Sequence, residues 1–270
     1  MQENSFSSPD LSGDEISAQV KGSFWKNILL YRSVSSTNEL TSSLSQSNKI
    51  GSGTVIIADQ QESGKGRLGR KWVSPPGSNI YMSIMIKPNI LPKDAAFLTL
   101  LAAVACTIAL VRTTGVEISI KWPNDLMVSG KKLGGILTEV RSESGRIKTA
   151  IIGIGINVNI TKKDFPTEIS PIATSLKEES GIYHSRTGII VQILREFENW
   201  NQIFSEAGKA PIIKQWRELS STSGKMVTVT TSQESFSGVA EDIDEEGRLI
   251  LRLPSGDMKK ISSGDVTMLR

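Results

Sequence analysis

Residues 95–111 form the longest apolar stretch of the chain, and such a stretch is either a membrane span or a buried helix. Its 17 residues lie at the short limit for a span and include Thr99 and Thr107. Asp94 precedes it, where an acid favours the positive end of a helix, and Gly115 follows it. We therefore predict a helix that is apolar on every side because it is buried in a core, with no membrane as a partner.

Apolar segments of strand length lie on both sides of this helix. They are β-branched or alternate with polar residues, and they cover 24–31, 54–58, 80–87, 117–122, 132–140 and 147–157. Helical periodicity follows at Ile189, Ile193, Phe197 and Trp200, and again at Ile212 and Trp216. This order predicts an antiparallel sheet with helices packed on it, which is an α+β fold.

The pattern changes after Gly224, where short alternating segments recur about every ten residues. This spacing predicts a small five-stranded barrel of roughly 50 residues. We place the boundary within 220–223, so that a main domain covers 24–221 and the barrel covers 222–270. Residues 1–23 are polar, acidic and serine-rich, which predicts a disordered tail rather than a signal peptide.

Charge and rare residues restrict the chemistry. The formal net charge is +3, but residues 24–222 carry +8, which indicates a site for an anion or a solvated basic face. The single cysteine, Cys106, forms no intramolecular disulfide and lies in an apolar run, as core packing does, so a reducing cytoplasm is expected. With one cysteine and one histidine, His184, the usual zinc sites and Cys/His catalysis are excluded.

A basic, glycine-rich loop covers residues 59–76. It contains Gly64-Lys-Gly-Arg-Leu-Gly69, which matches the dinucleotide-binding fingerprint, but Pro75 and Pro76 follow where that fingerprint needs a helix. The loop is not a P-loop either, because Asp59 stands where the first glycine belongs. Its glycines and cations can fold over an anion, and Trp72 offers a ring face for a base. A mobile basic surface loop is the alternative.

Two further motifs follow strands. Lys121-Trp-Pro-Asn-Asp125 ends a predicted strand, so its lysine is held on a rigid element and can neutralise a carboxylate and an α-phosphate together. Asn124 and Asp125 can orient a nucleotide or magnesium, or simply form a turn. Glycines also interrupt the strands at 132–137 and 152–158, where either a ligand or tight packing comes close to the backbone.

Five ordered motifs closely resemble those of the biotin protein ligases. They are Ser35-Ser-Thr-Asn38, Gln61-Glu-Ser-Gly-Lys-Gly-Arg67 with Gly69-Arg-Lys-Trp72, Lys121-Trp-Pro-Asn-Asp-Leu126, Lys132-Leu-Gly-Gly-Ile-Leu137 and Gly153-Ile-Gly-Ile-Asn-Val-Asn159. The resemblance covers about residues 24–160, and the C-terminal barrel stands where that family carries an SH3-like domain. It implies an α+β catalytic domain like that of class II aminoacyl-tRNA synthetases, with a mixed or antiparallel sheet.

The resemblance also implies a two-step reaction that uses ATP and Mg²⁺. The carboxylate of biotin attacks the α-phosphate of ATP to give biotinyl-5′-AMP and pyrophosphate, and a lysine of a biotin carboxyl carrier domain then takes the biotin. The carrier would belong to a biotin-dependent carboxylase, and the ligase would be a monomer or a homodimer.

Site residues are assigned by the same resemblance. Arg67 and Lys121 would be catalytic, holding the carboxylate and phosphoryl oxygens. Biotin would be contacted by Ser36, Thr37, Gln61, Gly64, Lys65, Arg67, Lys121, Gly134 and Gly135. The nucleotide would be contacted by Arg70, Trp72, Asn124 and Asn157, with magnesium bridging the polyphosphate and no metal site built by the protein itself.

The chain departs from the family pattern at three places. Lys65 stands where the family usually has arginine, which predicts weaker retention of the adenylate because lysine cannot make a planar bidentate contact. Arg270 lies one residue later than the family's terminal arginine and is left unassigned. The polar residues 1–23 cannot form the helix-turn-helix domain that some members carry, so we expect a monofunctional ligase without DNA binding.

Three alternatives to a biotin ligase have distinct requirements. A lipoate or octanoate ligase of the same fold would favour an elongated apolar pocket, whereas Ser36, Thr37 and Gln61 favour a polar ring. A biotin sensor without catalysis would not need Arg67 and Lys121. An RNA-binding module would need more than this barrel, which is net acidic and poor in aromatic residues.

Overall fold

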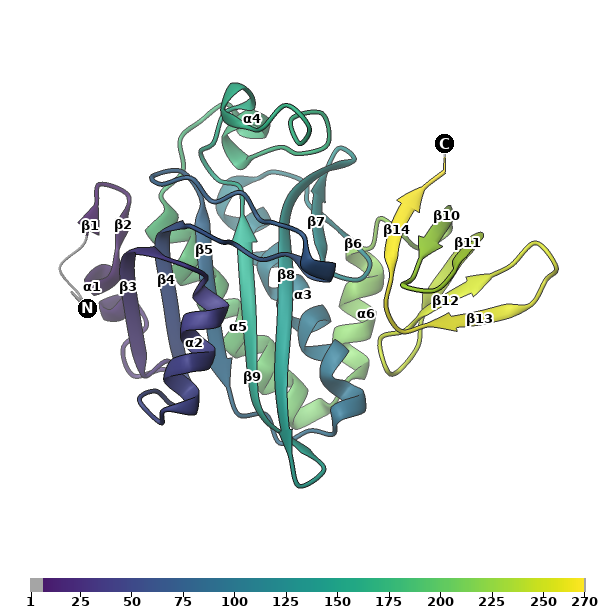
Figure 1. Ribbon diagram of the computed structural model, residues 1–270, viewed down its shortest axis with the longest axis horizontal. Coiled ribbons are helices and arrows are strands. Elements are labelled where there is room, and N and C mark those ends of the chain that lie inside the picture. The colour runs from purple at the N-terminus through teal and green to yellow at the C-terminus, as the bar shows by residue number, and fades with distance from the viewer. Residues whose placement is uncertain (1–6, 270) are drawn as a thin grey trace.

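The computed structural model describes residues 7–269. The main domain is built on a seven-stranded sheet in the order β3-β4-β5-β9-β8-β7-β6, and the C-terminal domain contains a five-stranded sheet (Figure 1). The strands of the large sheet are β3 Asn27–Val34, β4 Thr54–Gln61, β5 Ile80–Ile86, β6 Ser119–Lys121, β7 Asp125–Val128, β8 Lys131–Glu143 and β9 Arg146–Ile156. Strand β7 is not among the predicted strands, because four residues are too few for alternation to show.

The strands of the large sheet are not all antiparallel. β3 pairs with β4 in parallel, and the other neighbouring pairs are antiparallel. The antiparallel sheet predicted from strand spacing therefore needs correction at this edge, whereas the mixed or antiparallel sheet implied by the family resemblance is confirmed. Helix α2, Thr37–Gln46, makes the crossover that a parallel pair needs, and the sheet is mixed.

Helices cover both faces of the large sheet. Figure 1 shows α2 in front of it and the long helices behind it, which are α3 Ala95–Thr114, α5 Arg186–Ala207 and α6 Ala210–Leu219. Two shorter helices are α1 Gly13–Gln19 and α4 Leu176–Ser180.

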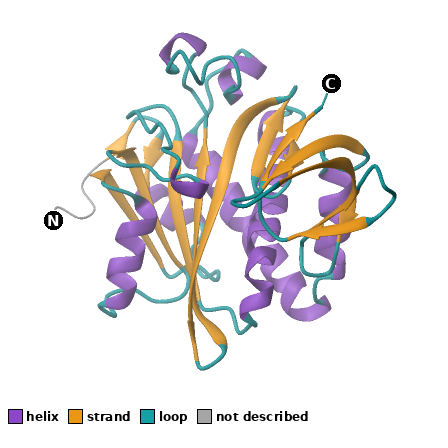
Figure 2. Cartoon of the chain, turned by 45° about the vertical axis from the view of Figure 1, so that its right-hand side comes forward, coloured by secondary structure: helices purple, strands orange, loops and turns teal. Residues whose placement is uncertain are grey.

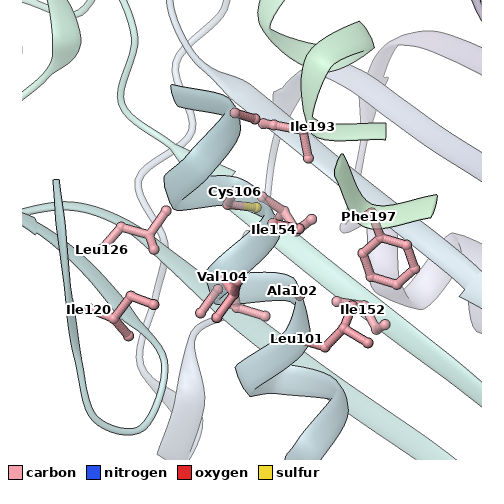
Figure 3. Close-up of a cluster of buried hydrophobic side chains, with 14 of the residues drawn as sticks. Leu101, Ala102, Val104, Cys106, Ile120, Leu126, Ile152, Ile154, Ile193 and Phe197 are labelled. Atoms are coloured by element: carbon pink, nitrogen blue, oxygen red, sulfur yellow. The ribbon is translucent and has the colours of Figure 1, made fainter. Parts of the chain in front are cut away.

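Helix α3 is the apolar stretch identified in the sequence, and it lies in the core. Leu98 and Leu101 are fully buried, and Figure 3 shows α3 side chains between Ile152 and Ile154 of β9 and Phe197 of α5. Burial of each such side chain contributes about 2 kcal/mol to folding. The helix is long and apolar enough to span a membrane by composition, but 67% of that window is buried inside the protein, as predicted for a core helix.

Cys106 belongs to the same core. Its thiol is fully buried, and burial raises the pKa of the thiol far above its usual range. The thiol stays protonated and is therefore not a nucleophile, as the sequence predicts.

The C-terminal domain packs against the β6 end of the large sheet (Figures 1 and 2). Its strands are β10 Lys225–Thr230, β11 Ser235–Ile243, β12 Leu249–Arg252, β13 Met258–Ile261 and β14 Asp265–Met268. Trp122 ties the two domains together, because its indole N–H donates to Gly247 O (3.0 Å) and its backbone N–H donates to Thr222 Oγ1 (3.0 Å).

The N-terminal segment is ordered where the structure describes it. β1 Ser7–Ser8 and β2 Leu11–Ser12 form a small antiparallel pair that leads into α1. Leu11, Ile16 and Val20 are buried in the main core. The prediction of a disordered tail is therefore wrong for residues 7–23, because three apolar side chains at wide spacing suffice to anchor the segment; residues 1–6 lie outside the described part of the chain.

Candidate active site

A cavity of about 750 Å³ opens between the glycine-bearing face of the large sheet, the 59–76 loop and strand β14 of the C-terminal domain. The two segments singled out in the sequence meet here, since Arg67 and Lys121 both line it. Convergence of these two cations on one cavity is the central expectation from the sequence, and it is confirmed.

The sheet contributes a face without side chains. Along β9, Ile152 and Ile154 are buried in the core, whereas Gly153 and Gly155 line the cavity. A Cβ at Gly155 would lie 2.7 Å from Nε1 of Trp72, so the indole rests directly on this strand. A Cβ at Gly153 would lie 2.4 Å from Oδ1 of Asn38. Gly155 therefore allows the close approach of Trp72, and Gly153 allows that of Asn38.

The 59–76 loop folds back on itself as a narrow hairpin. Gly66 N–H donates to Arg70 O (2.7 Å), and Trp72 N–H donates to Gly64 O (2.8 Å). The tip turns at Leu68, whose φ is 54°. Residues 72–75, which include Pro75, have no regular structure, and residues 76–78 form a turn. No helix follows the glycines, so the dinucleotide-binding interpretation is correctly rejected.

A buried polar cluster underlies one end of the cavity. Gln61 Oε1 accepts hydrogen bonds from the backbone N–H of Thr37 (2.9 Å) and from its hydroxyl (3.2 Å), while Gln61 Nε2 donates to Ser74 Oγ (3.0 Å). Ser83 Oγ lies 2.7 Å from Thr37 Oγ1 and 2.6 Å from Asn38 Oδ1. The cluster fixes the Gln61 amide and the start of α2, which suits recognition of a polar ring.

Arg67 reaches from the loop across the cavity. Its Nη1 donates to Asn124 Oδ1 (3.0 Å) and to Gly264 O (3.3 Å). Among the described residues, no carboxylate lies within ion-pair distance of this guanidinium. Burial lowers the pKa of Arg67, and the nearby Arg70 also lowers it, while Asp265 and Asp125 oppose this shift. A desolvated guanidinium without a counter-ion is suited to bind an anion.

Lys121 stands at the end of β6, as expected. Its Nζ lies 3.3 Å from Asp125 Oδ2, and Lys132 Nζ lies 2.6 Å from the other oxygen of the same carboxylate. Lys132 Nζ also lies 5.6 Å from the centre of the Trp72 ring. One carboxylate thus orients two ammonium groups, which leaves this side of the cavity net positive.

Two other loop cations, Lys65 and Arg70, form ion pairs at the rim. Lys65 Nζ lies 2.5 Å from Glu39 Oε1, and Arg70 forms an ion pair with Asp265 of β14. The hydrogen bond and charge of Lys65 lower the pKa of Glu39. These pairs connect the loop to α2 on one side and to the C-terminal domain on the other.

The structure brings most of the predicted site residues together. The cavity is lined by Ser36, Thr37, Gln61, Lys65, Arg67, Arg70, Trp72, Lys121, Asn124, Gly135 and Asn157. Gly64 and Gly134 are not among the lining residues, and their contact with biotin stays a prediction. A Cβ at Gly64 would lie 2.4 Å from Trp72 O, and one at Gly134 would lie 2.8 Å from Gly155 O, so both glycines serve backbone packing.

Asn38, Lys132, Gly153 and Gly155 also line the cavity, although sequence reasoning assigned none of them to the site. Each lies inside a motif quoted in the sequence analysis, so membership of a motif was the one feature of the sequence that could have indicated them. Which motif residues face the cavity follows from strand alternation and from helix rotation, and these require the fold.

Comparison with known proteins agrees with this geometry. Residues 30–157 match the model of the biotin/lipoate A/B protein ligase family, and residues 222–269 match the biotin protein ligase C-terminal domain. The biotin--[acetyl-CoA-carboxylase] ligase of Mycobacterium tuberculosis is 32% identical over 255 residues, which cover 92% of this chain and 91% of that protein. The chain belongs to the biotin protein ligase family.

Two other members extend the comparison. The bifunctional ligase/repressor BirA of Bacillus subtilis is 38% identical over 258 residues, covering 96% of this chain and 79% of that protein. Among solved structures, the biotin protein ligase of Aquifex aeolicus in complex with biotin and ATP superposes with a TM-score of 0.77 at 30% identity, covering 91% of this chain and all of that one. This chain therefore has the fold of the biotin protein ligases, which resembles that of class II aminoacyl-tRNA synthetases.

Proposed function

We propose that this chain joins biotin to a carrier protein in two steps within the one cavity. Biotin's carboxylate oxygen attacks the α-phosphorus of ATP, and pyrophosphate leaves, so that biotinyl-5′-AMP remains. The ε-amine of a lysine on a biotin carboxyl carrier domain then attacks the acyl carbon, loses a proton and releases AMP. The convergence of Arg67 and Lys121 on the cavity is the observation that supports this proposal most directly.

Both cations act on the charge of the reacting groups. The carboxylate and the α-phosphate repel one another before reaction, and negative charge on the phosphoryl oxygens persists during attack. Arg67 offers a planar fork for two oxygens, and Lys121 offers a point charge on a rigid strand. Adenylation needs positioning and cations rather than a protein nucleophile, which fits a site without reactive cysteine or histidine.

The polar cluster supports recognition of the biotin ring. Ser36 and Thr37 present hydroxyl and backbone groups at the start of α2, and Gln61 is held beside them. Gly135 allows close approach to β8 from the cavity side. Thr37 and Gln61 are held by hydrogen bonds to each other and to Ser74 and Ser83, so the ligand meets a preformed polar surface. Such a surface matches a polar ring better than the apolar chain of lipoate.

Trp72 and Arg70 are proposed to bind the nucleotide. The Trp72 ring offers a stacking surface beside Lys132, and Arg70 stands at the rim near Asp265. Asn157 lines the cavity at the end of β9, where its amide is held by donation to Thr174 O (3.0 Å). Asn124 contributes by holding Arg67.

Magnesium is proposed to arrive with ATP. Among residues 7–269, no group of three or more His, Cys, Asp or Glu side chains could hold a metal ion. Asp125 is the carboxylate that lies between Lys121 and Lys132. The polyphosphate oxygens would therefore supply most of the ligands, and the ion would neutralise the charge of the departing pyrophosphate.

The decisive experiment is exchange of labelled pyrophosphate into ATP, followed by labelling of a carrier domain. We expect exchange that depends on biotin, and covalent biotin on the carrier. Exchange stimulated by lipoate but not by biotin would assign the chain to the lipoate or octanoate ligases. Biotin binding without exchange would assign it to non-catalytic sensors.

The carrier is proposed to be a biotin carboxyl carrier domain of a carboxylase, and the location to be the cytoplasm. The carboxylase named in the relatives supports the first proposal, and the buried, unpaired Cys106 is consistent with a reducing compartment. Labelling of one carrier lysine in a cell lysate, lost when that lysine is changed to arginine, tests the partner.

A further inference from the structure

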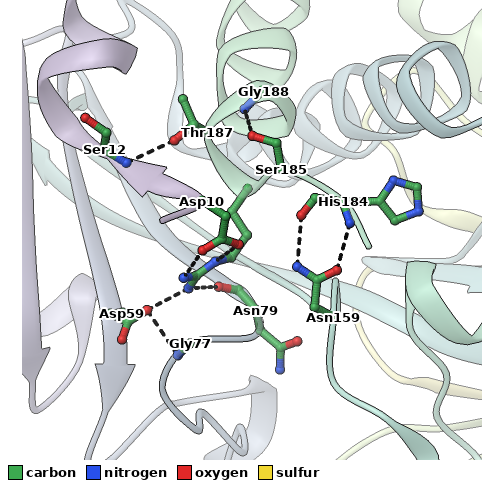
Figure 4. Close-up of polar contacts among 11 residues, drawn as sticks. Asp10, Ser12, Asp59, Gly77, Asn79, Asn159, His184, Ser185, Thr187 and Gly188 are labelled. Carbon is green, nitrogen blue, oxygen red and sulfur yellow. Dashed lines mark hydrogen bonds and ion pairs between the residues drawn. The ribbon is translucent and has the colours of Figure 1, made fainter. Parts of the chain in front are cut away.

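Arg186, the first residue of α5, is the most completely buried charged side chain described, with 0% exposure. It lies outside the cavity and joins three segments. Its Nε and Nη2 donate to the two oxygens of Asp10 (2.8 and 2.7 Å), and its Nη1 donates to Asp59 Oδ1 (2.6 Å). Figure 4 shows Asp10 on the side of Thr187 and Asp59 on the side of Gly77.

The partners of Arg186 stand at both ends of the active-site loop. Asp59 lies in β4 two residues before Gln61, and the same Asp59 oxygen accepts from Gly77 N–H (3.1 Å) beyond the loop. Arg186 Nη1 also donates to Asn79 O (3.3 Å), just before β5. One guanidinium therefore holds the point where the loop leaves the sheet and the point where it returns (Figure 4).

The same contacts reach the end of β9. Asn79 Oδ1 accepts from Val158 N–H (3.0 Å), and Asn159 N–H donates to Ser78 O (2.7 Å). Asn157, which lines the cavity, directly precedes Val158. A shift at Arg186 would therefore be transmitted to the loop ends and to the strand end at once.

Asp10 connects the N-terminal segment to this group. Besides its carboxylate contacts, its backbone O accepts from Thr187 N–H (2.9 Å), and Ser12 N–H donates to Thr187 Oγ1 (2.9 Å). The segment is anchored in the core through Leu11 and Ile16. Burial alone would lower the pKa of Arg186, but the hydrogen bonds that it donates to Asp10 and Asp59 raise it, so the guanidinium keeps its charge.

We propose that Arg186 is a positioning residue for the active-site loop and that Asp10 makes the N-terminal segment part of that positioning. The expected change in the kinetics of pyrophosphate exchange rests on the proposed function, whereas the expected change in the ordering of the loop does not. Without the bidentate Asp10 contact, the orientation of the Arg186 guanidinium would be less strictly fixed, although its contacts to Asp59 and Asn79 remain, and the two loop ends would be held less rigidly. The loop that carries Arg67 would then sample positions away from the reacting groups.

The test compares Asp10→Asn with Asp14→Asn, a matched change of an exposed carboxylate on the neighbouring helix α1. We expect Asp10→Asn to raise the KM for biotin in pyrophosphate exchange by about 10-fold, because the loop carries the proposed biotin contacts Gln61 and Lys65, and to lower kcat as well, because the loop carries Arg67. The backbone amides of Gly66 and Trp72 should exchange hydrogen faster, while those in the middle of β9 should stay protected. Asp14→Asn should change neither quantity.

Two results would overturn the proposal. One is an Asp10→Asn protein whose KM and loop exchange equal those of Asp14→Asn. The other is faster hydrogen exchange of the Asp10→Asn protein in β9 as well as in the loop, which would make Arg186 a determinant of global stability only. Arg186→Lys, which keeps the charge but not the fork, should show the loop effect more strongly. If the unmodified protein itself catalyses no pyrophosphate exchange, the proposed function fails. The comparison of amide hydrogen exchange still decides whether Arg186 positions the loop.

Discussion

Arg67 Nη1 lies 3.0 Å from Asn124 Oδ1, and this contact links the 59–76 loop to the motif that carries Lys121. The Asn124 amide is used at both ends, because its Nδ2 donates to Ile136 O (2.9 Å). Its orientation is therefore set by β8, and its oxygen sets the position of Arg67. Asn124 also lines the cavity, so holding Arg67 is a contact additional to the nucleotide contact predicted for Asn124.

Asn124→Ala should lower the rate of adenylation about 10-fold by releasing Arg67, since one hydrogen bond to a charged group is lost. The double variant with Arg67→Ala should be no slower than Arg67→Ala alone, because both changes remove one function. Pyrophosphate exchange measures both rates. If the rate of the double variant fell by the product of the two single fold-changes, Asn124 would act independently of Arg67.

Arg67→Ala and Lys121→Ala should each lower adenylation by ~10²-fold or more, as expected for lost electrostatic stabilisation of the reacting groups. Lys214→Ala is a suitable control, because it removes an exposed cation from α6, away from the cavity. Rates close to that of the control would remove either residue from the catalytic site.

Gly155→Ala should weaken nucleotide binding. The new Cβ would lie 2.7 Å from the Trp72 ring, so the indole must move off β9. Loss of one stacking surface predicts a rise of about 10-fold in the KM for ATP, with a smaller change for biotin. Gly51→Ala, where no atom lies within 4 Å of the new Cβ, should leave both constants unchanged. An equal rise for biotin and ATP would argue against a nucleotide-specific role for Trp72.

Lys65→Arg should slow the release of biotinyl-5′-AMP. Lys65 pairs with Glu39 through a single ammonium group, whereas arginine can contact Glu39 and a phosphate oxygen with different nitrogens. The dissociation rate of the adenylate, followed by fluorescence, measures the effect. Lys71→Arg in the same loop is the matched control, and an unchanged rate in Lys65→Arg would defeat the idea.

His184 should make the stability of the folded protein depend on pH at values near and below the usual histidine pKa of 6.5. Burial lowers the pKa of His184 below its usual value of 6.5, so the unfolded chain takes up a proton at a higher pH than the folded protein does. Its contribution is complete above pH 6.5 and is lost as the pH falls toward the lowered value. The melting temperature should therefore fall less between pH 7.5 and 5.5 for His184→Gln than for the unmodified protein. Parallel declines would assign the pH effect to other groups.

The local pattern of apolar and polar residues was enough to predict many of the helices and strands of this protein. The apolar run of α3, the alternation of β9 and the ten-residue spacing after Gly224 predict buried or half-buried elements, because side-chain periodicity follows directly from backbone geometry. The prolines after Trp72 excluded a dinucleotide-binding helix, since proline restricts the backbone by itself. The ordered motifs were sufficient for the family.

What the tertiary structure alone decided depends on contacts between residues far apart in the chain. Asp10 and Arg186 are separated by 176 positions, and nothing local to residues 7–23 indicates a buried guanidinium that would hold them. The parallel pairing of β3 with β4, the packing role of Gly64 and the use of Asn124 to hold Arg67 are of the same kind. Periodicity determines which side of an element is apolar, but the partner that meets each side is chosen by the packing of the whole chain.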